Sequence, residues 1–244
     1  MFEPRLALAS LSGESDAQWA RAGVPYAGGA FLGGLSLDEP TREAAETMVA
    51  DRDRDEFLPA APLEFMREQL DALVDVPIRP GFNVRAVGPG AIRPAARICA
   101  ERGAILEINA HCRQEEMCAA GAGETLLGHP ERLAAQVDAA ADEGATVSAK
   151  VRAEVPDVDL PALAARLEAA GLDAIHVDAM DSEAVIAEVV DATDAFVIAN
   201  NGVRDERTTR EYLAYGADAV SVGRPSDDPA VLERVSGTVR EWFA

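Results

Sequence analysis

The sequence predicts a (β/α)8 barrel, and two observations support this fold class. Short apolar segments alternate with alanine-rich amphipathic segments through the whole of the 244 residues. Several of the short segments, such as AIHV and AFVIA, are apolar throughout, as expected of parallel strands buried on both faces. The alternative is a doubly wound open sheet, which is less favoured because no Gly-x-Gly-x-x-Gly motif follows the first strand.

The predicted elements follow one another regularly. The strands are expected at 6–9, 25–30, 81–87, 104–108, 146–151, 174–177, 195–199 and 219–222. The helices are expected at 15–22, 41–54 with 62–74, 90–102, 130–143, 159–170, 182–191, 207–215 and 228–242. Prolines near helix starts and glycines just after helix ends support these limits, because proline tolerates the first helical turn and glycine the left-handed residue that ends a helix. Examples are Pro130, Pro161, Pro229, Gly103, Gly144, Gly171 and Gly216.

One segment, 35–76, departs from the regular alternation. It is acidic and proline-punctuated, and it is predicted to hold two helices between strands two and three. We interpret it as an acidic helical insertion, acting as a lid or as an oligomer contact. Residues 1–244 are thus expected to form a single (β/α)8 barrel domain with this insertion, without a helical C-terminal domain.

The composition points to an acidic cytoplasmic protein. The formal net charge is −21, and Lys150 is the only lysine among 22 basic residues, a composition similar to that of cytosolic proteins from salt-accumulating halophiles. No apolar run approaches the roughly 18 residues that a membrane span needs, and the N-terminus lacks the features of a signal peptide. Three cysteines argue against a disulfide framework, and neither they nor the histidines have the spacing of a metal site.

The candidate site follows from the barrel geometry. Residues at or just past the carboxyl ends of the strands converge on one mouth, where barrels of this kind bind their ligands. Lys150 is the most informative of them, because a buried ammonium needs an anionic or electron-rich partner. The residues selected in this way are Ser10, Arg85, Asn109, Cys112, Lys150, Asp178, Asn201, Gly202, Gly223 and Arg224.

Two of these groups have a specific chemical interpretation. Gly202 and Gly223, with Arg224, follow the last two strands, where barrels often bind phosphate through backbone N–H groups; the alternative is a pair of ordinary turns. Cys112, in a polar loop three residues after Asn109, is a nucleophile, an acid or a buried apolar residue. Cys99 and Cys118 lie in helical or alanine-rich segments and are interpreted as structural.

These motifs resemble those of the dihydrouridine synthase family, FMN-containing (β/α)8 barrels, and in particular its short archaeal members. The family pattern N-x-G-C-P followed by G-A-G-x-x-L-L is similar to NAHCR at 109–113 and GAGETLL at 121–127, without a gap. The N-terminal pattern A-P-M-x-G-x-T-D is similar to ASLSGESD at 9–16. The V-K-x-R, N-G-D and G-R motifs correspond to KVR at 150–152, NGV at 201–203 and GR at 223–224.

The resemblance implies roles for these residues. FMN would lie over the barrel mouth, with its phosphate held by Asn201, Gly202, Gly223 and Arg224, and NADPH or NADH would reduce it. Lys150 would face the pyrimidine edge of the flavin. In the family reaction the reduced flavin gives hydride to C6 of a uracil, and Cys112 would protonate C5 as a general acid. Asn109 would help to orient the base. Ser10, Arg85, His176 and Asp178 would complete the cofactor site.

The sequence also departs from the family pattern. His111 and Arg113 replace the glycine and proline beside the cysteine, Arg85 replaces a glutamine, and Asp178 replaces a histidine, although His176 lies two residues earlier. Residues 1–244 are not expected to include a counterpart of the family's helical C-terminal domain, which helps to grip tRNA. These departures leave open tRNA or a small pyrimidine as the substrate, the latter as in dihydroorotate dehydrogenases. They also leave open a degenerate barrel that binds FMN or a phosphate ligand without catalysis. The oligomeric state is a separate question, and the sequence leaves a homo-oligomer open.

Overall fold

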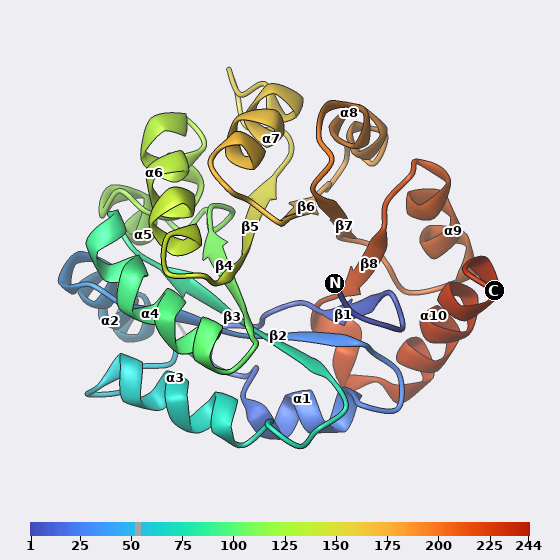
Figure 1. Ribbon diagram of the computed structural model, residues 1–244, viewed down its shortest axis with the longest axis horizontal. Helices are drawn as coiled ribbons and strands as arrows, with labels where there is room; N and C mark the ends of the chain where they lie inside the picture. Colours follow the sequence, from blue (N-terminus) through green and yellow to red (C-terminus); the bar gives the residue numbers. More distant parts are fainter. Residues whose placement is uncertain (52–54) are drawn as a thin grey trace.

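The computed structural model describes residues 1–51 and 55–244, in which eight parallel strands close into a barrel with helices around it (Figure 1). Each strand pairs with the next along the chain, and β8 returns to β1 through Leu6↔Val220, Ala7↔Ser221 and Leu8↔Val222. The predicted (β/α)8 fold is therefore confirmed. The strands are β1 (Leu6–Leu8), β2 (Gly29–Ser36), β3 (Arg79–Arg85), β4 (Ile105–Asn109), β5 (Thr146–Arg152), β6 (Ala174–Asp178), β7 (Phe196–Asn200) and β8 (Ala219–Val222).

The helices form the outer ring in Figure 1. They are α1 (Ala17–Gly23), α2 (Glu39–Asp51), α3 (Pro62–Asp71), α4 (Pro89–Glu101), α5 (Glu115–Ala119), α6 (Pro130–Ala141), α7 (Leu160–Ala169), α8 (Val185–Ala192), α9 (Glu206–Ala214) and α10 (Pro229–Trp242), with 3-10 turns η1 (Gly123–Leu126) and η2 (Arg224–Asp227). The predicted main helices match these within a few residues, whereas α5 and both 3-10 turns were not predicted. None of the described helices is long and apolar enough to cross a membrane.

The second strand was predicted at the wrong place. It runs over Gly29–Ser36, whereas the sequence suggested 25–30. The glycines at 33 and 34 look like a turn in the sequence, but here the strand continues past them with a register shift between Gly33 and Leu35. Such an irregularity lets one extra residue be absorbed without ending the strand. The insertion consequently starts after Ser36, two residues later than expected.

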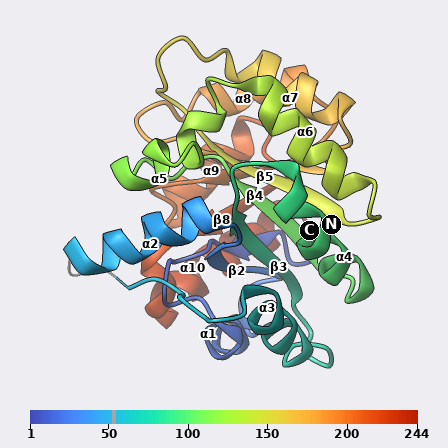
Figure 2. The same cartoon turned by 90° about the vertical axis from the view of Figure 1, so that its left-hand side faces the viewer.

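The insertion between β2 and β3 holds two helices, as predicted, although the end of the predicted helix 41–54 lies outside the described residues. Figure 2 shows α2 lying beside α5, on the side of the barrel where β4 ends. Met48 of α2, Met117 of α5 and Cys112 belong to one buried apolar cluster. The insertion thus packs directly against the loop that carries Cys112.

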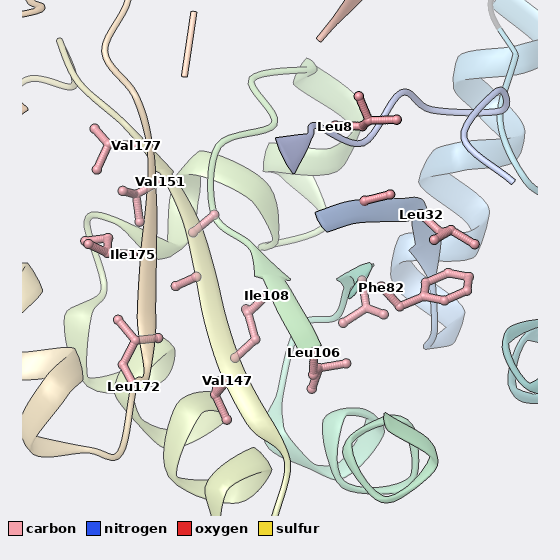
Figure 3. Close-up of a cluster of buried hydrophobic side chains, with 14 of the residues drawn as sticks. Leu8, Leu32, Phe82, Leu106, Ile108, Val147, Val151, Leu172, Ile175 and Val177 are labelled. Atoms are coloured by element: carbon pink, nitrogen blue, oxygen red, sulfur yellow. The ribbon is translucent and has the colours of Figure 1, made fainter. Parts of the chain in front are cut away.

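The main apolar core lies between the strands and the outer helices. Outward-facing side chains such as Phe82, Ile108 and Val177 are fully buried there (Figure 3). Inside the barrel a smaller apolar group that includes Phe2 and Phe31 fills the end opposite the mouth. Figure 1 shows the N-terminus within the ring of strands. The interior becomes polar towards the carboxyl ends of the strands, where the candidate site lies.

Candidate functional site

A cavity of about 790 Å³ opens at the carboxyl ends of the strands. It is lined by loops from both halves of the barrel, as the strand-end rule requires. Ten of the eleven predicted site residues line it: Ser10, Arg85, Asn109, Cys112, Lys150, Asp178, Asn201, Gly202, Gly223 and Arg224. The geometry therefore brings together residues that lie more than two hundred positions apart in the chain.

Lys150 lies at the floor of this cavity. The side chain extends from β5, and the residue is 3% exposed. Burial lowers the pKa of its ammonium group, against the opposing charges of Glu107 and Asp178. Within residues 1–51 and 55–244 the ammonium makes no hydrogen bond or ion pair. A nearly buried ammonium without a direct partner is costly, so the site is suited to a ligand group that is anionic or rich in electron density.

The Cys112 loop is held in place from two sides. The Oδ1 atom of Asn109, the last residue of β4, accepts hydrogen bonds from the backbone N–H of Cys112 at 3.1 Å and of His111 at 3.4 Å. On the other side, the N–H of Glu124 donates to the Cys112 carbonyl oxygen at 2.9 Å. Gly123 adopts φ +60°, and a Cβ atom there would lie 2.2 Å from the same oxygen. Only glycine fits, which explains why the Gly-Ala-Gly motif follows the cysteine at this spacing.

His111 is a further cavity residue that the sequence did not single out for a role. Its Nδ1 atom is enclosed and has no hydrogen-bond partner in the described structure. Burial lowers the pKa of the imidazole well below its ordinary value, and nearby positive charges, among them Lys150 and Arg85, add to this effect. The ring is therefore neutral at neutral pH.

The other end of the cavity is formed by the turns after β7 and β8. Asn201 and Gly202 both adopt left-handed backbone conformations, with φ of +89° and +67°. The Asn201 side chain donates from Nδ2 to Asp178 Oδ1 at 2.7 Å, and the backbone carbonyl oxygen of Asn201 accepts from the Tyr212 hydroxyl at 2.9 Å. No atom lies within 4 Å of a Cβ placed at Gly202 or at Gly223. This open space beside backbone amides suits a phosphate group.

Arg85 is bound to the protein rather than free. Its guanidinium donates to Glu56 Oε2 at 2.7 Å and to Ser12 Oγ at 2.6 Å. Glu56 and Ser12 were not predicted; both come from segments far from β3 in the sequence, and the pairing depends on how the insertion folds back. Arg85 still lines the cavity, but its charge is offset by Glu56.

His176 is the one predicted site residue that does not line the cavity. It shares the inward face of β6 with Asp178, as expected, but it lies deeper and is fully buried. Its Nδ1 is 2.7 Å from Glu107 Oε2 and its Nε2 is 2.7 Å from Ser221 Oγ. His176 therefore reaches the cavity through Ser221, which lines it, and does not line the cavity itself. Sequence reasoning missed Glu107, although a carboxylate within an apolar strand is an unusual signal.

Comparisons with known proteins agree with this picture. A sequence model of the family described as "Dihydrouridine synthase (Dus)" matches residues 84–242. No curated protein matches the sequence. Among solved structures, two of FabK from Thermotoga maritima, one a point mutant, have TM-scores of 0.59 at 17% identity. A chain of the tryptophan synthase α2β2 complex from Pyrococcus furiosus has a TM-score of 0.60 at 13% identity.

The coverage of these structures differs. The FabK matches include 92% and 91% of this chain but only 63% and 58% of the FabK chains, so this chain spans less than two thirds of their length. The tryptophan synthase match includes 100% of this chain and 99% of the other. At these identities the structural likeness shows the barrel fold alone.

Proposed function

Since the chain belongs to the dihydrouridine synthase family, we propose that it is an FMN-dependent oxidoreductase that reduces the C5=C6 bond of a uracil. The observation that carries the proposal is the placement of Lys150. An enclosed ammonium without a direct partner, a thiol and an open phosphate-sized turn line the same cavity. A flavin mononucleotide has the matching groups, an electron-rich ring edge and a phosphate.

The residues present fit this cofactor. Backbone amides and side chains around Asn201, Gly202, Gly223 and Arg224 would hold the phosphate, with Arg224 supplying charge-assisted hydrogen bonds. The Lys150 ammonium would bind the pyrimidine edge of the ring and stabilise negative charge there. When bound and reduced, FMN would supply the hydride for C6 of the uracil.

Cys112 would supply the proton for C5. The residue is 7% exposed and lines the cavity, so a thiol proton can reach a substrate there while bulk water has little access. Asn109 acts chiefly through the loop, because its Oδ1 binds the loop amides and its Nδ2 donates to Asn83 Oδ1 at 2.8 Å. One N–H of Asn109 remains to orient a base.

A second candidate substrate is a free pyrimidine or another small conjugated molecule. The replacement of a family glutamine by Arg85 is the observation in its favour, because Arg85 ties the insertion to the cavity through Glu56. Two acidic residues, Glu14 and Asp55, also line the cavity, and the net charge of −21 opposes the approach of a polyanion at ordinary ionic strength. For either substrate, NADPH or NADH is the proposed reductant.

The test is the absorption spectrum of the protein purified in high salt, followed by FMN titration. We expect flavin bands, and we expect Lys150→Met to weaken FMN affinity about 10- to 100-fold, because a hydrogen bond to a charged group contributes about 1.5–3 kcal/mol. Arg234→Ala, which removes an exposed cation on α10, serves as the control. A colourless protein that binds no added FMN would overturn the proposal and favour a barrel that holds another phosphate ligand.

The substrate is then tested with the flavin-loaded protein. Reduced enzyme is mixed with unmodified tRNA transcript or with free uracil, and reoxidation of the flavin is followed together with dihydrouracil formation. Reduction of the transcript supports the tRNA substrate, and reduction of the free base alone supports the small-molecule alternative. A protein that binds FMN but reduces neither would contradict both.

A further inference from the structure

A continuous hydrogen-bond network crosses the barrel beneath the cavity. Glu107 of β4 lies at its centre and is fully buried. On one side Asn83 donates to Glu107 Oε1 at 2.7 Å, and Asn109 donates to Asn83 Oδ1 at 2.8 Å. On the other side His176 is bonded to Glu107 Oε2, and Ser221 to His176, each at 2.7 Å. Ser148 of β5 also donates to Glu107 Oε2, at 3.4 Å, so the network joins strands β3, β4, β5, β6 and β8.

The direction of these bonds follows from the chemistry of the groups. An ionised carboxylate can only accept, so Asn83 must turn its NH2 group towards Glu107. The carbonyl oxygen of Asn83 then faces Asn109 and accepts from it. As a result Asn109 presents its own oxygen to the loop, where the backbone N–H of Cys112 donates at 3.1 Å. A backbone N–H group can only donate, so the loop end of this chain is consistent with the orientation that Glu107 requires at the other end.

The same reasoning applies on the other side. His176 must donate from Nδ1 to Glu107, which leaves Nε2 of the neutral ring as an acceptor for the Ser221 hydroxyl. The Ser221 oxygen in turn accepts from Asn200 Nδ2 at 2.8 Å. Asn200 lines the cavity, and its Oδ1 remains available to a ligand donor because the described residues offer it no hydrogen bond.

We propose that Glu107 is a positioning residue, whose carboxylate sets the direction of its hydrogen bonds with Asn83 and His176 and, through them, favours the direction of the bonds further along the network. Through Asn83 it orients the side-chain amide of Asn109, which in turn orients the Cys112 loop. Through His176 and Ser221 it orients the side-chain amide of Asn200, which faces the cavity. The roles of Asn109 and Cys112 in this inference rest on the proposed function, whereas the direction of the network does not.

The charges around Glu107 support an ionised carboxylate and a neutral imidazole. Burial alone would raise the pKa of Glu107, but His176, Lys150 and Asn83 outweigh it and hold the pKa below its ordinary value. Burial also lowers the pKa of His176, to which Lys150 adds, against the effect of Glu107 and Asp178. The imidazole also packs against the ring of Phe31, with the two ring centroids 5.3 Å apart, and against the hydroxyl of Ser221.

The experiment reads the tautomer of His176 by long-range ¹H–¹⁵N correlation in the flavin-free protein at neutral pH. The chain has three histidines, so variants His111→Gln and His129→Gln identify the His176 signal by elimination. In the wild type we expect the proton on Nδ1 only. In Glu107→Gln the amide NH2 faces His176, because the amide oxygen is needed by Asn83, and we expect the proton to move to Nε2.

The control is Glu143→Gln, which changes a carboxylate that binds Arg97 outside the barrel and should leave the tautomer unchanged. A wild-type His176 protonated on Nε2, or on both nitrogens, would overturn the inference even if Glu107→Gln fails to fold. An Nδ1 proton that persists in folded Glu107→Gln would also overturn it. None of these readouts depends on flavin binding, so they are separate from the test of the proposed function.

The link to the loop is tested with Asn83→Ala, which interrupts the chain between Glu107 and Asn109. We expect the His176 tautomer to stay on Nδ1 and the Cys112 backbone amide to exchange about tenfold faster, because the hydrogen bond that it makes is loosened. Unchanged exchange in a folded variant would show that Glu107 does not act on the loop.

Discussion

Arg85 and Glu56 form an ion pair of 2.7 Å in which both side chains are at most 2% exposed. Arg85 ends strand β3, whereas Glu56 belongs to the insertion between β2 and β3. The pair therefore joins the insertion to the cavity wall. Burial on this scale makes each charge depend on the other, because neither can be solvated by water.

Replacing Arg85 by glutamine should leave the Glu56 carboxylate buried beside a neutral group. We expect Arg85→Gln to lower the free energy of unfolding by about 3–5 kcal/mol, as when one member of a buried pair is removed. The double variant Arg85→Gln with Glu56→Gln should recover much of that loss. Urea unfolding in high salt measures both, and equal losses in the single and double variants would contradict the pairing.

Removal of the Cys112 thiol should separate binding from chemistry. We expect Cys112→Ala to keep FMN affinity within about twofold and to slow reduction of a uracil substrate about 10²- to 10⁴-fold, the usual contribution of a general acid. Cys118→Ser is the matched control, because Cys118 lies on α5 and does not line the cavity. Unchanged turnover in Cys112→Ala would remove the acid assignment.

Two glycines with the same backbone conformation allow the loop contact to be measured. Gly123 has φ +60° and Gly103 has φ +61°, but only at Gly123 would an added Cβ meet close neighbours, with the Cys112 carbonyl oxygen 2.2 Å away. We expect Gly103→Ala to cost about 1 kcal/mol of stability from backbone strain. Gly123→Ala should cost about 1–3 kcal/mol more, because the Cys112 carbonyl must move. Similar losses at both positions would contradict the contact.

Acid should destabilise the fold through its enclosed histidines. The pKa values of His111 and His176 are lowered in the folded protein, so the unfolded chain binds more protons as the pH falls below about 6.5. As the pH falls below that value, the free energy of unfolding decreases by up to about 1.4 kcal/mol per pH unit for each histidine. Urea unfolding between pH 7.5 and 5.5 should show this slope, and His111→Gln should halve it. His129→Gln is the control, and a slope of zero in the wild type would contradict the prediction.

The acidic surface should make stability depend on salt. With a net charge of −21, self-repulsion grows as salt is removed, because screening weakens. We expect the Tm to fall steadily as KCl is lowered from molar to low millimolar concentrations. A Tm that does not change over this range would contradict the interpretation of the composition as halophilic.

Much of the site could be predicted because, in a (β/α)8 barrel, a residue belongs to the mouth if it lies at or just past the end of its own strand, which can be recognised from the neighbouring sequence. Each βα loop begins where a strand ends, so Asn109, Lys150 and Asn201 could be assigned to the mouth from sequence alone. The fixed sequence spacing between Cys112 and Gly123 also has a structural reason, because Gly123 packs closely against the carbonyl oxygen of Cys112. Strand β2 was misplaced because its glycines have no side chain whose alternation would reveal the pleat.

What the sequence by itself determined is therefore the fold class and the set of residues that face one cavity, since both depend on periodicity and on strand ends. Only the tertiary structure decided how those residues are paired. Glu107 and His176 are 69 positions apart, and Arg85 and Glu56 are 29 apart. Their contacts depend on strand register, on depth within the barrel and on the path of the insertion. A buried charge is stabilised by whichever partner closure of the barrel brings within hydrogen-bonding distance, and no local pattern encodes that partner.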